Sequence, residues 1–225
     1  MPSTNDWPLA ERPRERLLAQ GPGVLSDAEL LAIVFGSGNA NGSALDCARG
    51  VLGRHGNLSR LLGTPVSTLA RSDGLGPARA AKLKAGVELA RRLLREEVSQ
   101  GSALTSPEAV RDYLRLTLAS LPHEVFVVLF LDSQHRLLAA DELFRGTLAQ
   151  TSVYPREIVK AALGHNAAAV IFAHNHPSGV AEPSRADELL TQALKQALSL
   201  VDIRTLDHFV VAGHSVVSFA ERGLL

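Results

Sequence analysis

The spacing of hydrophobic residues changes near residue 100. Before that point, apolar residues recur every three or four positions, which is the repeat of an amphipathic helix. The tetrapeptide SDAE at 26–29 is a capping box and marks the start of one such helix. After that point, continuous apolar runs of strand length, such as 125–131 and 167–173, alternate with helical segments. The pattern predicts an all-helical first part and a second part that mixes strands with helices.

Each expected element follows from its local pattern and from the residues that interrupt it. In the first part we expect helices over 11–20, 26–35, 43–52, 58–62 and 65–70, and a long helix that ends near residue 98. In the second part we expect helices over 106–118, over 154–164 and from residue 184, and strands over 125–131, 137–144, 170–173, 205–211 and 216–219. Strands interleaved with helices favour an α/β sandwich, so the fold class is α/β (α+β).

The segment 99–106, SQGSALTS, is small, polar and glycine-containing, as linkers between domains are. We therefore predict a helical domain over 1–98, a linker over 99–106 and a mixed-sheet domain over 107–225.

Composition excludes several classes of site and partner. The 225 residues carry no net charge, although residues 1–100 hold 13 Lys and Arg against 10 Asp and Glu, a mild hint that this part meets a polyanion. Cys47 is the single cysteine, so a disulfide within the chain and a cysteine-based zinc site are both excluded. Without a signal pattern or an apolar run of membrane length, we expect a soluble cytoplasmic protein with no membrane partner.

Two histidines directly follow the apolar run 167–173. His174 and His176 are one residue apart, so in an extended segment their side chains point the same way. Ser184 and Asp187 follow at the start of a helix, where they could simply cap it. Two imidazoles and a carboxylate with a fourth position open also make up a catalytic zinc site. The combination favours the metal site over separate structural roles.

This arrangement of His-x-His, a seven-residue loop, Ser and then Asp resembles the motif of the JAMM (MPN-type) metallopeptidases. In that family the two His and the Asp bind zinc, and an upstream Glu is the general base. The resemblance implies that His174, His176 and Asp187 bind one Zn²⁺ per chain. It also implies that the Ser184 hydroxyl stabilises the developing oxyanion.

The general base must come from outside this motif, and two glutamates are candidates. We favour Glu124, because members of the family place this residue at the start of the first strand and Glu124 directly precedes 125–131. Glu142, which follows a different strand pattern, remains the alternative. Asp207 or His208 could orient a ligating histidine.

The segment 73–83, DGLGPARAAKL, looks like a helix-hairpin-helix motif. In such a hairpin Gly74 and Gly76 would expose backbone N–H groups to a DNA phosphate, and Arg79 and Lys82 would add positive charge. The alternative interpretations are a turn that only packs two helices and a hairpin that binds protein.

Both parts together resemble the bacterial RadC family over nearly the whole chain. The matching stretches are 25–33, 146–148, 155–158, 166–169, 174–179 and 206–208. The resemblance implies a JAMM-type domain behind a helix-hairpin-helix-like domain and an association with DNA repair, but it brings no known substrate. This chain has Tyr154 where the family usually has His, and Val180-Ala181 where it usually has Asp-Pro.

Three functions follow as hypotheses. The first is a zinc-dependent hydrolase of peptide or isopeptide bonds in an unidentified protein or peptide substrate. The second is a DNA-binding adaptor whose metal site is structural or vestigial. The third is a metal-dependent nuclease.

Overall fold

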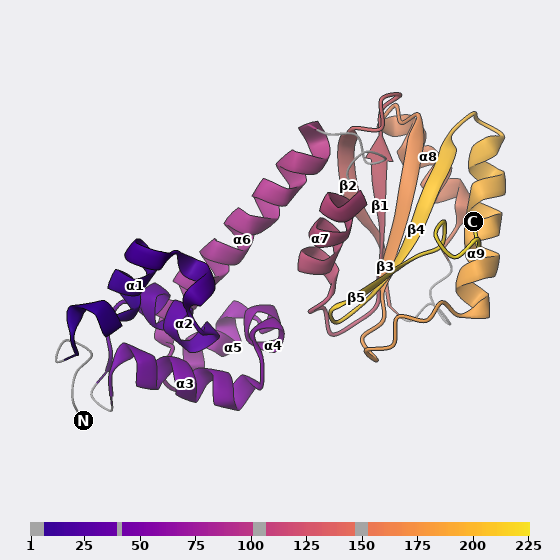
Figure 1. The fold of residues 1–225 in the computed structure, drawn as a ribbon. Coiled ribbons are helices and arrows are strands. Elements are labelled where there is room, and N and C mark those ends of the chain that lie inside the picture. Colours follow the sequence, from indigo (N-terminus) through magenta and orange to yellow (C-terminus); the bar gives the residue numbers. More distant parts are fainter. Residues whose placement is uncertain (1–6, 40–41, 101–106, 147–152) are drawn as a thin grey trace. The chain divides into compact units, whose positions relative to one another are not determined.

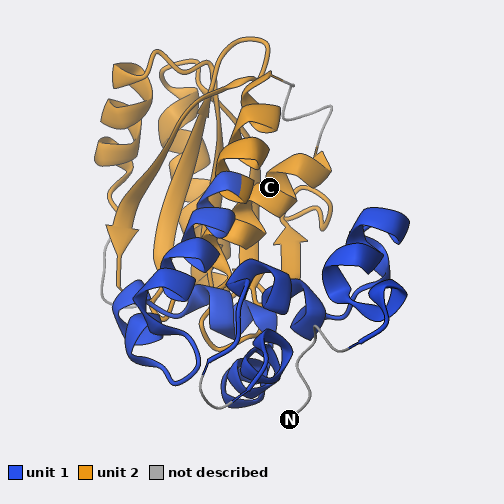
Figure 2. Ribbon diagram, turned by 90° about the vertical axis from the view of Figure 1, so that its left-hand side faces the viewer, with its two compact units in different colours: residues 1–89 blue, residues 90–225 orange. Residues whose placement is uncertain are grey.

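The computed structural model describes residues 7–39, 42–100, 107–146 and 153–225. The chain divides into two compact units, residues 1–89 and 90–225 (Figure 2). In the described ranges no helix is long and apolar enough to cross a membrane.

The division at residue 89 differs from the boundary expected at residue 98. The long helix α6 (Gly76–Gln100) continues through that position, and Leu94 and Val98 near its end pack into the core of the second unit. Of the expected linker 99–106, Ser99 and Gln100 belong to α6, and residues 101–106 lie outside the described residues.

The first unit is helical, as the sequence pattern predicts. Its described residues form the 3₁₀ turns η2 (Leu9–Glu11) and η3 (Pro22–Val24), the helices α1 (Pro13–Gln20), α2 (Asp27–Phe35), α3 (Ala44–His55), α4 (Leu58–Gly63) and α5 (Val66–Arg71), and the start of α6. Capping boxes at Ser26 and Ser43 begin α2 and α3. The apolar faces of these helices enclose one core that includes Phe35, Val51 and Leu61.

The second unit contains a mixed five-stranded sheet, so the predicted fold class is confirmed. Its elements are α7 (Pro107–Leu118), β1 (Val125–Leu131), β2 (Leu137–Arg145), α8 (Pro155–Gly164), β3 (Ala169–Asn175), α9 (Arg185–Ser199), β4 (Arg204–Ala212) and β5 (Ser215–Ser218). The strand order is β2-β1-β3-β4-β5. All neighbouring strands are antiparallel except β3 and β4, which are parallel (Figure 1).

Alternation along the central strands gives the sheet two apolar faces. In β1, Val127 and Leu129 face the core that includes α7, whereas Phe126 and Val128 face the core that includes α8 and α9. Strands β1 and β3 are buried at every position, which explains why they are continuous apolar runs in the sequence. Helix α9 connects β3 to β4, and its N-terminus follows the carboxyl end of β3. That end of β3 carries the two histidines.

Candidate metal centre

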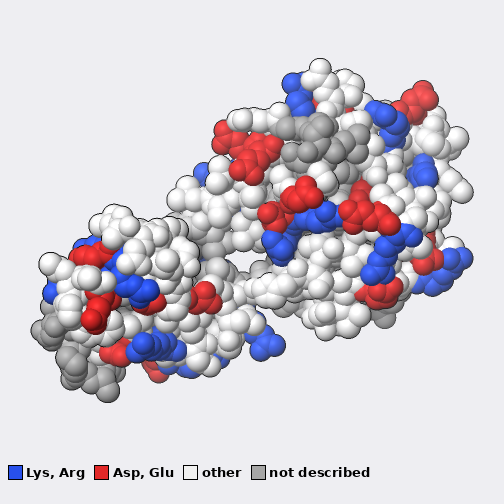
Figure 3. Space-filling view, viewed as in Figure 1, with Lys and Arg blue, Asp and Glu red and all other residues white. Residues whose placement is uncertain are grey.

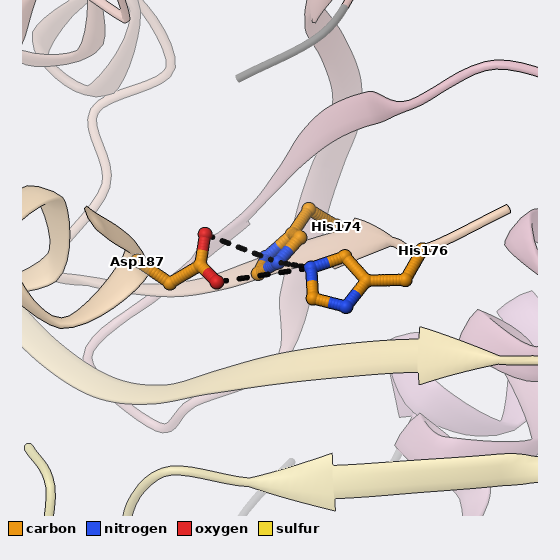
Figure 4. A group of neighbouring side chains, drawn as sticks. All are labelled: His174, His176 and Asp187. Atoms are coloured by element: carbon orange, nitrogen blue, oxygen red, sulfur yellow. Dashed lines mark hydrogen bonds and ion pairs between the residues drawn. The ribbon is translucent and has the colours of Figure 1, made fainter. Parts of the chain in front are cut away.

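The three predicted metal ligands converge at the carboxyl end of β3. His174 lies in β3, His176 follows its last residue, and Asp187 lies in the first turn of α9 (Figure 4). Nε2 of His174 is 3.0 Å from Nε2 of His176 and 3.4 Å from Oδ1 of Asp187. The side chains of His174 and Asp187 are 1% exposed, and that of His176 is 14% exposed. The structure therefore contains a group of side chains that could bind a metal ion.

The separations between these atoms are short enough for the three side chains to bind one metal ion. Bonds of about 2.0–2.1 Å in tetrahedral geometry place ligand atoms about 3.3–3.4 Å apart. The separations here are 3.0 Å and 3.4 Å, and Nε2 of His176 lies 3.7 Å from Oδ2 of Asp187. Two nitrogens and a carboxylate are also a donor set that zinc prefers.

The Asp187 carboxylate is held by a capping box at the start of α9. The backbone N–H and the hydroxyl of Ser184 donate to Oδ2 at 2.7 and 2.6 Å. Burial raises the pKa of Asp187, but the neighbouring His174 ring and the hydrogen bonds from Ser184 outweigh that effect, so the pKa of this carboxyl lies well below its usual range. Oδ1, which accepts neither Ser184 bond, faces His174.

The Ser184 hydroxyl is therefore engaged as the helix cap. It donates to Oδ2 of Asp187 and accepts from the Asp187 backbone N–H at 3.2 Å. The resemblance to the JAMM family implies the role of an oxyanion donor for this hydroxyl, and that role would require the hydroxyl to leave Asp187.

Each of the two candidate ligand histidines has a partner on its other ring nitrogen. Nδ1 of His176 lies 2.8 Å from the carbonyl oxygen of Val180. This contact uses backbone, so it does not need the Asp-Pro pair that the RadC resemblance would place at Val180-Ala181. Nδ1 of His174 lies 2.7 Å from Nε2 of His208, which is completely buried. Burial lowers the pKa of His208 well below its usual value, so its ring is neutral.

Asp207 does not orient a ligand. Its carboxylate accepts hydrogen bonds from the Ser218 hydroxyl and from the backbone N–H groups of His208 and Ala220. Burial raises the pKa of Asp207, against the effect of these bonds. The carboxylate thus connects the first half of β4 to the end of β5 and to the turn after it.

The two candidate bases lie at different places in the sheet. Phe126 pairs with His174 in the antiparallel β1–β3 ladder, and Glu124 directly precedes β1, two residues before Phe126. Glu142 pairs with Val127, whose side chain belongs to the core on the α7 face, and its carboxylate accepts from Arg145 at 2.7 Å. Glu142 therefore faces away from His174. Glu124 stays the predicted base.

Asn175, between the two histidines, is a site residue that sequence reasoning missed. Its side chain is buried and accepts from the Val125 N–H at 2.9 Å, while its amide donates to the carbonyl oxygens of Leu121 and His123. These hydrogen bonds attach residues 121–125, which include Glu124, to the end of β3 next to His174 and His176. The available signal was alternation, which turns a residue between two ligands to the other face.

Thr191 is a second residue that the sequence did not indicate. Its hydroxyl lies 2.6 Å from the carbonyl oxygen of Asp187 and 2.6 Å from Nδ1 of His208. Its spacing of four residues from Asp187 places both on one side of α9, which is a weak signal in sequence alone.

The segment predicted to form a hairpin contains the turn that joins α5 to α6 in the first unit. Gly74 and Gly76 have φ values of +79° and +67°, which glycine adopts without steric cost. Lys82, predicted to meet DNA, directs its ammonium group to the carbonyl oxygen of Phe35 at 3.4 Å.

Arg79 makes internal contacts as well. Its guanidinium donates to the carbonyl oxygens of Gly74, Ser37 and Gly38, the last at 2.8 Å, and lies 5.2 Å from the centre of the Phe35 ring. The side chain therefore joins the turn before α6 to the turn after α2.

We expect Arg79→Ala to destabilise the first unit by about 2 kcal/mol, because hydrogen bonds from a charged group contribute about 1.5–3 kcal/mol. Trp7 is the single tryptophan and packs against the core of the first unit. Its fluorescence can therefore follow the urea unfolding of this unit. Arg71→Ala, at the exposed end of α5, is the matched control and should change the stability by less than about 0.5 kcal/mol. Equal losses in both variants would contradict the structural role of Arg79.

Comparisons with known proteins agree with this architecture. Residues 104–224 match the "RadC-like JAB domain" family, and residues 4–81 match the "UPF0758 N-terminal" family. A UPF0758 protein of Methylibium petroleiphilum is 64% identical over 98% of this chain and 99% of its own length. UPF0758 proteins of Dechloromonas aromatica and Nitrosomonas eutropha are 62% and 59% identical, each over 98% of this chain and at least 98% of the relative. The chain belongs to the RadC-like JAB domain family.

Proposed function

We propose that the protein is a zinc-dependent hydrolase of the JAMM type that cleaves peptide or isopeptide bonds. The observation that carries the proposal is the convergence of His174, His176 and Asp187 at separations of 3.0–3.7 Å. Three protein ligands leave one tetrahedral position open, as catalytic zinc sites do and closed structural sites do not.

The side chains around this site have distinct roles in the proposed reaction. A zinc ion bound here would lower the pKa of a water from ~15.7 to about 7 and polarise a substrate carbonyl. Glu124 would accept the proton of the attacking water and later pass it to the leaving amine. Asn175 holds the Glu124 segment in place through Val125, and Ser184 holds Asp187.

Metal analysis tests the proposal directly. After reconstitution and removal of excess metal, the purified chain should retain one zinc, and Glu124→Gln should retain the same amount. A reconstituted protein without stoichiometric zinc would exclude this function. Release of new peptide termini in cell extract by wild-type protein, absent with Glu124→Gln, would establish the reaction class.

DNA binding by the hairpin is a second proposal, which would place such an enzyme on a chromosome and connect it with DNA repair. The glycine turn before α6 supports it, since backbone N–H groups at a helix start can hold a phosphate. Arg79 and Lys82 weigh against it because their donors meet internal carbonyls. On the face shown in Figure 3, basic and acidic side chains are intermixed.

We therefore expect any DNA binding to be weak and to fall steeply with salt. Gel shifts over a salt series should show weaker binding by Gly76→Asp than by Gly21→Asp, which adds the same charge at another glycine of the unit with a positive φ and open space around it. Identical shifts for the two variants would remove the hairpin as the DNA site.

A further inference from the structure

We propose that His208 and Thr191 are positioning residues that select the tautomer of His174 and keep the lone pair of its Nε2 directed at the metal. The inference rests on the proposed metal site and deepens it.

Three short contacts form a continuous series of hydrogen bonds that connects α9, β4 and β3. The Thr191 hydroxyl donates to the backbone carbonyl of Asp187 at 2.6 Å and lies 2.6 Å from Nδ1 of His208. Nε2 of His208 lies 2.7 Å from Nδ1 of His174. The far nitrogen of His174 is the one that faces His176 at 3.0 Å.

The positions of the protons in this series of hydrogen bonds follow from the carbonyl oxygen of Asp187, which can only accept a hydrogen bond. The carbonyl of Asp187 takes the single hydroxyl proton of Thr191, so the hydroxyl oxygen must accept from Nδ1–H of His208. A neutral imidazole has one donor and one acceptor, so Nε2 of His208 accepts from Nδ1–H of His174. Nε2 of His174 then carries no proton. The opposite order of donors would put a proton there and block metal binding through that nitrogen.

His208 has little freedom to leave this arrangement. Its ring is completely buried among aromatic side chains, with centroids 4.6 Å from Phe219, 5.5 Å from Phe126 and 5.8 Å from Phe172. Since these rings offer no strong hydrogen-bonding group, Thr191 and His174 are the partners available to its two nitrogens.

His176 reaches the same state by a separate route. Its Nδ1 lies 2.8 Å from the carbonyl of Val180, which can only accept, so the neutral tautomer carries its proton on Nδ1 and leaves the lone pair on Nε2. Outer hydrogen bonds of this kind fix the orientation and tautomer of ligating histidines. Of the two histidine ligands, His174 alone depends on another titratable side chain. His208 therefore determines whether the Nε2 atom of His174 can bind a metal ion.

The gentlest test is Thr191→Val, which removes the hydroxyl with little change in shape. We expect its zinc dissociation constant, measured by chelator competition, to rise about 10-fold, at the low end of the 10–100-fold typical of outer-shell changes. Thr205→Val is the matched control, because the buried Thr205 hydroxyl has no hydrogen-bond partner among the described residues. It should bind zinc like the wild type.

Two further measurements separate positioning from folding. Long-range ¹⁵N–¹H NMR of metal-free wild-type protein should place the proton of His174 and that of His208 on Nδ1. His208→Gln, which keeps an acceptor near the position of Nε2, should bind zinc more tightly than His208→Leu.

The outcomes distinguish this inference from the proposed function. Wild-type zinc affinity in Thr191→Val, or a proton on Nε2 of His174 in the metal-free protein, would overturn the positioning role while the metal site stands. A wild-type protein that binds no zinc would overturn both.

Discussion

Glu124→Gln is expected to reduce peptide or isopeptide hydrolysis by about 10³-fold, because general-base catalysis typically contributes 10²–10⁴-fold. Glu124 is outside the group of candidate ligands, so the zinc content of the variant should stay at one per chain. A base-deficient enzyme should also retain its substrate. Incubating the tagged variant with cell extract and identifying retained proteins by mass spectrometry would supply the substrate for the rate measurement.

The matched control is Glu142→Gln, the same change at a residue that faces away from His174. Glu142 accepts from Arg145 and is paired with Val127, so its loss should leave hydrolysis near the wild-type rate. A rate loss in Glu142→Gln with none in Glu124→Gln would reverse the assignment of the base.

Asp187→Ala is expected to abolish zinc binding and also to weaken the metal-free fold. The carboxylate is both a predicted ligand and the partner of the Ser184 N–H and hydroxyl in the capping box. Losing such a cap costs about 1–2 kcal/mol. His176→Ala should also lose zinc, yet lower the metal-free stability by less than about 1 kcal/mol, since its ring is partly exposed and its other bond is to the Val180 carbonyl.

Zinc content by elemental analysis and urea unfolding of chelator-treated protein measure the two effects separately. Asp46→Ala, which breaks the corresponding capping box at Ser43 in the first unit, should leave zinc content unchanged. Retention of a full zinc equivalent by Asp187→Ala would remove that carboxylate from the ligand set.

Much of the fold could be predicted because its signals are local. Capping boxes at Ser26 and Ser43 begin helices where the pattern placed them, and the apolar run 125–131 is a buried central strand. The division of the chain at residue 89 was not predictable from composition, because it depends on which core receives Leu94 and Val98. Helical periodicity identifies the apolar face of a helix but not its partner.

The site shows the same limit. His174, His176 and Asp187 could be proposed together because their spacing in sequence is short. The contacts of His208 and Thr191 depend on the parallel register of β3 with β4, and the face of Glu142 depends on a bulge in the β1–β2 ladder. Arg79 appeared to be a surface charge after a hairpin, yet it binds a carbonyl 41 residues away. No local pattern specifies such partners.

The parallel pairing of β3 with β4 also bears on when the site is completed during folding. His174 and His208 are 34 residues apart, with the whole of α9 between them. Closing such a long loop costs conformational entropy, which is lost before the contacts between the two strands can offset it. A chain emerging from the ribosome would carry all three proposed ligands before β4 is made. Tight binding of zinc would require His208, which β4 supplies. Zinc would therefore bind after the C-terminal strands are synthesised.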